Sequence, residues 1–288
     1  MTEFSERYGP WALVAGASMG IGRAFSHEAA RRGLNVVMMA RGEALLRETA
    51  AEVSNEHGVE TRPLVADLER ADIGDVVADA TRELDVGLFV YNAAIAMHGR
   101  FLDVPLADQL ASVTVNCATP IILCNLLARR MVNRGRGGIV MVSSNGGIAG
   151  AINFGTYNAG KAFEWILAET LWTELGEQGV DVTTIMVGPT LSPNYAAFQA
   201  TLDPALAGGR DSDDPLERAR ARLLAASPPE DVAVTSYDAL GNGQPVCFSH
   251  PDDEMIFRGT LALPRDEAVA VWRGVQETST RTPDRIAR

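Results

Sequence analysis

Cysteine is scarce in this chain, which contains three in 288 residues. Cys117, Cys124 and Cys247 form no Cys-x-x-Cys pair, and the first two lie seven residues apart in a stretch with helical character. Disulfide frameworks and cysteine-based metal sites both show closer and more regular spacing. We therefore expect three buried thiols in a reducing compartment, with no disulfide framework and no metal site.

Positive charge is also in short supply, because 25 Lys and Arg face 37 Asp and Glu and leave a formal net charge of −12. Such a surface repels nucleic acids and anionic membranes, so neither is an expected partner. Residues 1–10 lack an apolar core of signal-peptide length, and no run long enough to span a bilayer is expected. These absences predict a cytoplasmic protein.

Repeats and low-complexity tracts are absent as well. Hydrophobic residues make up 47% and charged residues 22% of the chain, which is typical of a soluble enzyme. The length allows a large core, and we expect a single catalytic domain over residues 1–288 with a polar tail at about 278–288.

Glycine, by contrast, is concentrated in the stretch Gly16-Ala17-Ser18-Met19-Gly20-Ile21-Gly22, which follows the apolar run 11–15 and precedes a helical pattern over 23–32. A strand, a glycine turn and a helix together present backbone N–H groups to a pyrophosphate. The spacing G-x-x-x-G-x-G differs from the G-x-G-x-x-G fingerprint, and a plain tight loop is the alternative.

Arg41 directly follows the next apolar run, 35–40. At this position an acidic residue suits the ribose hydroxyls of NAD, whereas an arginine suits the 2′-phosphate of NADP. Arg41 therefore favours NADP(H) over NAD(H). The competing interpretation is a solvated surface residue.

Apolar runs and helical patterns alternate along the chain, which predicts an α/β fold, a doubly wound parallel sheet (Rossmann fold) with helices on both faces. Ligands of such sheets bind at the carboxyl ends of the strands, where Gly16, Arg41, Asp67, Asn92 and Ser144 fall. The predicted strands, about seven, are 11–15, 35–40, 60–66, 86–91, 138–143, 181–187 and 245–248. The predicted helices include 23–32, 43–56, 72–84, 102–134, 214–224 and 264–276, with another opening at 229–233.

Tyr157 and Lys161 lie four residues apart in a predicted helix, so their side chains share one face and the ammonium favours the ionised phenol. Ser144 precedes Tyr157 by thirteen residues (157 − 144), which is enough for a strand to end and a helix to begin. A Tyr-x-x-x-Lys match alone also occurs by chance.

These residues, in this order, resemble the motifs of the classical short-chain dehydrogenase/reductase family. The resemblance covers roughly residues 10–192 and is carried by Gly16, Gly20, Gly22, Asp67, Asn92-Ala93-Ala94, Asn116, Ser144, Tyr157 and Lys161. The chain departs from the family at Val187-Gly188, where Pro-Gly is usual; this loosens the turn that presents Thr190 and Ser192 to the nicotinamide.

The resemblance implies the roles of the site residues. The glycine turn would hold the dinucleotide phosphates, Asp67 would meet the adenine, and Asn92 would support the central sheet. The implied cofactor site consists of Gly16, Ser18, Met19, Gly20, Ile21, Gly22, Arg41, Asp67, Leu68, Asn92, Ala93, Tyr157, Lys161, Gly188, Pro189, Thr190 and Ser192.

The implied catalytic residues are Asn116, Ser144, Tyr157 and Lys161. As hydride reaches a carbonyl carbon, the growing negative charge on oxygen needs donors already aimed at it. Tyr157 would protonate that oxygen as a general acid, and Ser144 would hydrogen-bond it. Lys161 would also bind the ribose hydroxyls. Asn116 would hold a water that links Lys161 to solvent, or it bonds a local carbonyl.

Residues 193–226 form a predicted helical lid, with apolar Tyr195, Phe198, Leu202 and Leu206 and a helix capped at Asp214-Pro215. The segment would close over an apolar ketone or alcohol, or pack on a neighbouring subunit. His98 is either a pocket residue or incidental.

The expected function is a metal-free NADP(H)-dependent carbonyl reductase or alcohol dehydrogenase acting on an apolar steroid-, aromatic- or acyl-type ketone. The extended relatives that modify nucleotide sugars use a different glycine spacing, G-x-x-G-x-x-G. The non-enzymatic alternative is a dinucleotide sensor, a class that usually loses the Tyr or the Lys.

A homodimer or homotetramer is implied by the resemblance, because helices at these positions pair subunits in the family. Trp165, Ile166 and Trp172, with Leu123 and Leu127, are expected to supply the apolar surface. Ordinary core packing is the competing interpretation.

Overall fold

The computed structural model describes residues 3–192, 195–196, 199–200, 202, 209, 212, 215–276 and 284–285. Its central feature is a seven-stranded sheet in the order β3-β2-β1-β4-β6-β7-β8, with every neighbouring pair parallel. The reversal of strand order between β1 and β4 makes it doubly wound, as predicted. The strands are β1 Trp11–Ala15, β2 Asn35–Ala40, β3 Thr61–Val65, β4 Val86–Tyr91, β6 Gly137–Ser144, β7 Val180–Val187 and β8 Val246–Cys247.

Two helical layers cover the sheet because apolar residues of the buried strands point alternately to its two faces. Along β1, Ala12 and Val14 join one apolar cluster, and Leu13 joins the other. The first cluster is completed by α2 Gly20–Arg31, α3 Glu43–His57 and α10 Pro229–Gly241. The second is completed by α4 Ile73–Ala80, α6 Thr119–Arg134 and α7 Gly155–Gly176.

The predicted strands and the first three predicted helices agree with the observed elements to within a few residues, but the long helix predicted over 102–134 is interrupted. It consists of α5 Leu106–Val113, a π-helical turn η1 Thr114–Ala118, and α6. Asn116 lies inside the π turn. Its buried side chain makes hydrogen bonds with the backbone of Ile95.

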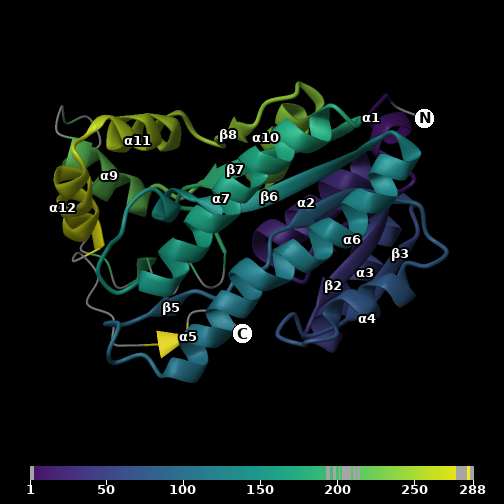
Figure 1. Ribbon diagram of the computed structural model, residues 1–288, viewed down its shortest axis with the longest axis horizontal. Coiled ribbons are helices and arrows are strands. Elements are labelled where there is room, and N and C mark those ends of the chain that lie inside the picture. Colours follow the sequence, from purple (N-terminus) through teal and green to yellow (C-terminus); the bar gives the residue numbers. More distant parts are fainter. Residues whose placement is uncertain are drawn as a thin grey trace.

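Several elements were not predicted. These are α1 Glu3–Tyr8, α11 Pro251–Ala262, and the antiparallel pair β5 Met97–His98 with β9 Asp284–Arg285. The tail predicted at 278–288 therefore has two residues in a strand, and its other residues lie outside the described part. Of the predicted lid, Phe198, Leu206 and Asp214 lie outside it too. Helix α9 Pro215–Leu224 is present and gathers with α11 and α12 Arg265–Gln276 at one end of the molecule (Figure 1).

The run Leu106–Arg134 is long and apolar enough, by length and composition, to cross a membrane. The expectation that no such run exists is therefore wrong on those two criteria. In the fold, 44% of its most apolar window is buried. Leu123 and Leu127 of α6 are fully buried against the sheet, which identifies the run as a core helix in this fold.

Candidate active site

The carboxyl ends of the strands open into a cavity of about 530 Å³. Seventeen of the nineteen residues predicted for cofactor binding or catalysis line this cavity. Its lining includes Gly16, Ser18, Met19, Gly20, Ile21, Arg41, Asp67, Leu68, Asn92, Ala93, Ser144, Tyr157, Lys161, Gly188, Pro189, Thr190 and Ser192. Gly22 and Asn116 lie behind this wall.

The glycine turn is shaped by close backbone contacts. Gly16 and Gly20 have φ values of +81° and +54°, a region that favours glycine. A Cβ on Gly22 would lie 1.9 Å from the Gly16 carbonyl oxygen, so only glycine lets α2 start this close to the turn. The Asn92 amide donates to the same oxygen over 3.1 Å and ties β4 to the turn.

The N-terminus of α2 fits a bound phosphate group. Its N-cap residue, Met19, makes no side-chain capping hydrogen bond, and Met19 lines the cavity. The first N–H groups of a helix need partners, and an anion placed there is stabilised by them and by the helix dipole. The turn is therefore suited to the pyrophosphate of a dinucleotide.

Arg41 supplies a cation at the end of β2, next to Gly42 and Leu45 on the cavity wall. Its guanidinium lies 3.5 Å from the Glu69 carboxylate, and its side chain remains one-third exposed. Asp67, at the end of β3, is exposed and accepts a hydrogen bond from the Glu69 backbone N–H over 3.0 Å. Leu68 is buried, and its carbonyl accepts from the Thr119 hydroxyl.

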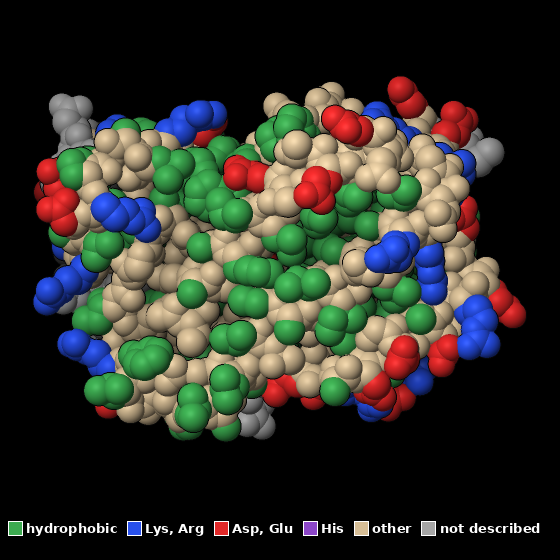
Figure 2. All heavy atoms as spheres, viewed as in Figure 1, with side chains coloured by type: hydrophobic (Ala, Val, Ile, Leu, Met, Phe, Trp, Pro, Cys, Tyr) green, Lys and Arg blue, Asp and Glu red, His purple; other side chains and the backbone are tan. Residues whose placement is uncertain are grey.

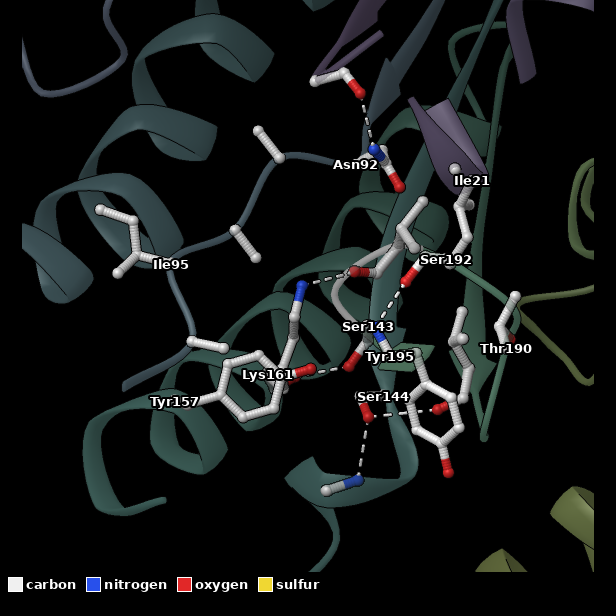
Figure 3. A pocket seen from close by; sticks show the side chains of 18 of the residues that line it. Ile21, Asn92, Ile95, Ser143, Ser144, Tyr157, Lys161, Thr190, Ser192 and Tyr195 are labelled. Carbon is white, nitrogen blue, oxygen red and sulfur yellow. Dashed lines mark hydrogen bonds between the residues drawn. The ribbon is translucent and has the colours of Figure 1, made fainter. Parts of the chain in front are cut away.

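Ser144 and Tyr157 face the cavity from β6 and α7 (Figure 3). The Ser144 hydroxyl accepts from the Gly146 N–H and donates to the Val187 carbonyl, each over 3.1 Å. These bonds hold the serine at the end of its strand, from which a rotation about its side chain would turn the hydroxyl to a ligand. The Tyr157 ring packs 6.1 Å from the ring of Phe154, measured between centroids.

Lys161 is buried and lies one helical turn after Tyr157, with its ammonium 5.9 Å from the centre of the tyrosine ring. The ammonium donates to the Val142 carbonyl and to the Glu164 carboxylate, each over 2.7 Å. Glu164 is fully buried, and burial raises its pKa to about 7 in spite of the lysine beside it. No local pattern in the sequence distinguishes this acid from other helical residues.

Asn116 lies next to the catalytic helix without lining the cavity. Its side chain accepts from the Ile95 N–H and donates to the Ile95 carbonyl and to Ser112. A Cβ on Gly160 would lie 2.7 Å from the Asn116 Cβ, so the glycine before Lys161 allows the two helices to approach. These contacts are with local backbone; the water relay implied by the family resemblance stays a prediction.

A buried ion pair closes the far side of the cavity, and sequence patterns did not indicate it. Arg222 of α9 makes two hydrogen bonds to the Asp253 carboxylate of α11, over 3.1 and 2.9 Å. A Cβ on Gly188 would lie 2.0 Å from an Asp253 oxygen. Glycine is thus needed after Val187, because the turn that leads to Thr190 packs directly against this carboxylate.

The remaining wall of the cavity is largely apolar and comes from both predicted and unpredicted elements. Tyr195, predicted as a lid residue, donates its hydroxyl to the Leu223 carbonyl. His98 is buried against Phe154 and does not line the cavity. Apolar or aromatic lining residues on this side are Phe154, Tyr195, Ala219, Leu223, Ile256, Trp272 and Val275.

Comparison with protein families gives a match to the model described as short chain dehydrogenase over residues 10–203. A 7beta-hydroxysteroid dehydrogenase of Collinsella aerofaciens is 33% identical over 236 residues, which cover 82% of this chain and 84% of that protein. A very-long-chain 3-oxoacyl-CoA reductase of Anas platyrhynchos is 33% identical over 183 residues, 62% of this chain and 59% of that one.

Among solved structures, one of a 7beta-hydroxysteroid dehydrogenase aligns with a TM-score of 0.80 at 29% identity and covers 93% of this chain and 98% of its own. A short-chain dehydrogenase from Sphingobium yanoikuyae in complex with NADPH aligns with a TM-score of 0.70 at 26% identity, over 83% of this chain and 87% of its own. These neighbours support a nicotinamide cofactor.

Proposed function

The chain belongs to the short-chain dehydrogenase family of oxidoreductases, and from this premise we propose that it interconverts a ketone and a secondary alcohol with NADP(H). The observation that carries the proposal is the single cavity that joins the glycine turn and Arg41 to Ser144, Tyr157 and Lys161. Binding and proton-transfer groups thus share one wall.

The glycine turn and Arg41 would hold the dinucleotide, whose nicotinamide, when bound, would supply hydride to the carbonyl carbon or accept it from the alcohol carbon. In the reductive direction Tyr157 donates its phenolic proton to the carbonyl oxygen, and Ser144 donates a hydrogen bond to the same oxygen. Lys161 places a positive charge beside the tyrosine ring and stabilises the phenolate left behind. In the oxidative direction Tyr157 accepts the proton.

NADP(H) is proposed over NAD(H) because of Arg41. It follows β2 and lines the cavity, where a cation can meet a 2′-phosphate. Glu69 lies 3.5 Å from the guanidinium and competes for it. The solved relative from Sphingobium yanoikuyae contains NADPH.

For the substrate we propose a bulky, ring-shaped ketone of the hydroxysteroid class. The far side of the cavity is mostly apolar, as a site for such a molecule must be, with Tyr157 and Ser144 as polar groups at its inner end. Relatives named 7beta-hydroxysteroid dehydrogenase match over four-fifths of the chain. The 3-oxoacyl-CoA reductases match a shorter stretch.

The proposal is tested with purified protein, NADPH or NADH, and matched steroid, aromatic and acyl-thioester ketones, following cofactor absorbance. We expect the highest kcat/KM with a steroid ketone and NADPH, at least about tenfold above the same ketone with NADH. Tight NADPH binding without turnover of any ketone would instead support a dinucleotide sensor. Higher kcat/KM with NADH would contradict the role of Arg41.

We further propose a cytoplasmic homodimer or homotetramer. The apolar surface that the structure offers for pairing differs from the predicted one. Leu123 and Leu127 are fully buried, and Trp165 packs on Phe257. Ile166 and Trp172 are exposed, as expected. Exposed apolar side chains instead follow α5, α6 and α7 at Leu106, Leu110, Val113, Ile121, Ile122 and Ile166. Figure 2 shows hydrophobic side chains and few charges across the middle of this face.

A further inference from the structure

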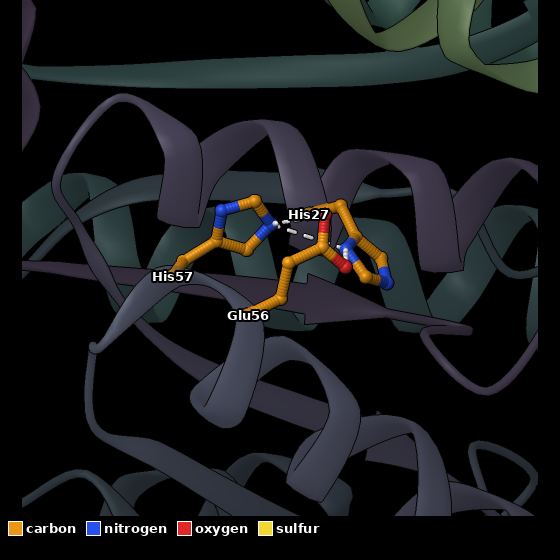
Figure 4. A group of neighbouring side chains, drawn as sticks. All are labelled: His27, Glu56 and His57. Atoms are coloured by element: carbon orange, nitrogen blue, oxygen red, sulfur yellow. Dashed lines mark hydrogen bonds and ion pairs between the residues drawn. The ribbon is translucent and has the colours of Figure 1, made fainter.

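A second cluster of polar side chains lies outside the cavity, between α2 and the end of α3. His27 comes from the middle of α2, and Glu56 and His57 are the last two residues of α3. None of the three lines the active-site cavity. Figure 4 shows the Glu56 carboxylate between the two imidazole rings.

The potential ligand atoms lie at the separations that a small metal ion requires. His27 Nδ1 is 3.1 Å from His57 Nε2 and 3.5 Å from a Glu56 oxygen, and His57 Nε2 is 3.8 Å from the other Glu56 oxygen. A tetrahedral ion with ligands at about 2.0–2.1 Å separates neighbouring ligand atoms by about 3.3–3.4 Å. The two nitrogens are already close to this separation, and a turn of the Glu56 carboxylate that brings one oxygen towards both rings would complete one face of the tetrahedron.

The surroundings of the two rings also suit a metal. Both His side chains are mostly buried, at 17% and 14% exposure, and their orientations are limited by the surrounding helices. The two facing imidazole nitrogens lie 3.1 Å apart, so a cation bound between them would take the place of a hydrogen bond.

Surrounding charge favours a cation. Glu56 supplies one negative charge directly, and Glu52 lies 3.9 Å from the opposite nitrogen of His27. Arg23 is the opposing charge, and its two hydrogen bonds with Glu52 offset these two charges against each other, which leaves the negative charge of Glu56 for a cation. The chain as a whole carries a net charge of −12.

We propose that His27, Glu56 and His57 form a binding site for one transition-metal ion, best suited to Zn²⁺. Two imidazole nitrogens and a carboxylate oxygen are a borderline-soft ligand set that excludes Mg²⁺ and Ca²⁺, and water would occupy the fourth position. The ion would join α2 to α3. It would act as a brace for the helix that starts at the glycine turn, with no part in the hydride transfer.

The test uses the full chain without an affinity tag, dialysed against a chelator and titrated with Zn²⁺ by calorimetry. We expect one Zn²⁺ per chain with a micromolar or lower Kd, and a rise in Tm of about 5 °C at saturation. Titration with Co²⁺ should give the visible absorption of a tetrahedral site. No saturable binding would overturn the proposal.

Variants assign the site. His57→Gln should weaken Zn²⁺ binding at least about 100-fold, and Glu56→Gln about tenfold. His250→Asn is the matched control, since His250 is also next to an acid, Asp252, and asparagine preserves its N-cap role. Should His57→Gln fail to fold, Glu56→Gln decides, because that side chain is more than half exposed. Unchanged affinity in Glu56→Gln, or an equal loss in His250→Asn, would contradict the assignment.

Discussion

The buried Lys161–Glu164 pair sets the charge beside the proposed proton donor. The two side chains are only 4% and 0% exposed and lie 2.7 Å apart. Since burial raises the pKa of Glu164 to about 7, its negative charge appears near neutral pH. We therefore expect Glu164 to act on Tyr157 through the lysine, as a positioning residue.

Replacing Glu164 with Gln should shift the pH dependence of alcohol oxidation. Oxidation needs the Tyr157 phenolate, which an ionised Glu164 opposes, so the variant should reach half its maximal rate at a lower pH, by about 1 unit. The measurement is kcat against pH for both proteins. A lower kcat with an unchanged pH profile would leave Glu164 a packing role only.

The same raised pKa predicts a pH-dependent stability. The unfolded chain ionises Glu164 near its ordinary pKa of 4.5, whereas the folded chain resists ionisation up to about 7. The contribution of Glu164 to the free energy of unfolding is therefore fully present below about pH 4.5 and is lost as the pH rises through 7. The Tm of wild type should fall relative to that of Glu164→Gln as the pH rises over this interval. Parallel curves of Tm against pH would contradict the expectation.

Arg41 can be tested by its effect on cofactor choice. Arg41→Ala should lower kcat/KM for NADPH at least about tenfold and leave that for NADH nearly unchanged, because only NADPH has the 2′-phosphate. Arg47→Ala is the control, since Arg47 is exposed and paired with Glu43 one turn earlier on α3. Equal losses for both cofactors would indicate a general effect on the site.

Among the residues of the site, those that directly follow strands could be predicted from the sequence. Those whose place depends on tertiary contacts could not. Gly16, Arg41 and Ser144 could be located because strand ends converge in a parallel sheet. Glu164 is a helical residue like any other until its burial is known. Arg222 and Asp253 are 31 residues apart, and no local pattern brings them together.

At the scale of elements, the Arg222–Asp253 pair joins α9 to α11 across the far wall of the cavity. Arg222 also donates to the Ala225 carbonyl and the Ser227 hydroxyl, so it holds the turn that follows α9 as well. Burial raises the pKa of Asp253, although Arg222 opposes this. Removing one partner would leave the other buried and unpaired.

Arg222→Met should therefore loosen α9 and raise KM for the ketone at least about tenfold, with a smaller change in kcat. Steady-state kinetics at saturating cofactor measure both values. Arg258→Met provides the control, because Arg258 on α11 is exposed and paired with Glu254. An unchanged KM in Arg222→Met would show that the pair does not shape the substrate side.

The π turn η1 explains why the prediction of one continuous helix over 102–134 was wrong. Apolar periodicity over 102–134 continues through Thr114–Ala118, so the pattern contains no signal for a change of helix type. The deviation follows from Asn116, whose side chain binds Ile95 and Ser112. Such turns often occur at functional sites.

At the scale of the whole molecule, the alternation of strands and helices was sufficient to predict the seven-stranded parallel sheet. Because crossovers between parallel strands are right-handed and both faces of the sheet are buried, few other topologies fit such a pattern. The helices α11 and α12, which complete the cavity, depend on packing against α9, and α11 was not predicted. Whether residues 1–288 fold as one domain stays a prediction.

Self-association through α5, α6 and α7 can be tested with a single substitution that introduces a charged side chain. Ile121→Lys should reduce the oligomer to a smaller species in light scattering, because a symmetric contact would bury the new ammonium twice. Leu261→Lys on α11 is the control, with 48% exposure against 49% for Ile121. Equal masses for Ile121→Lys and wild type would place the contact elsewhere.

The proposed reaction depends on proton transfer from Tyr157 to a ketone held beside a bound nicotinamide. The most direct measurement compares wild type and Tyr157→Phe in one preparation series, with NADPH binding by fluorescence and ketone turnover by absorbance. We expect nearly equal NADPH affinity and a loss of kcat of at least about 100-fold in the variant. Turnover by Tyr157→Phe at the wild-type rate would contradict it.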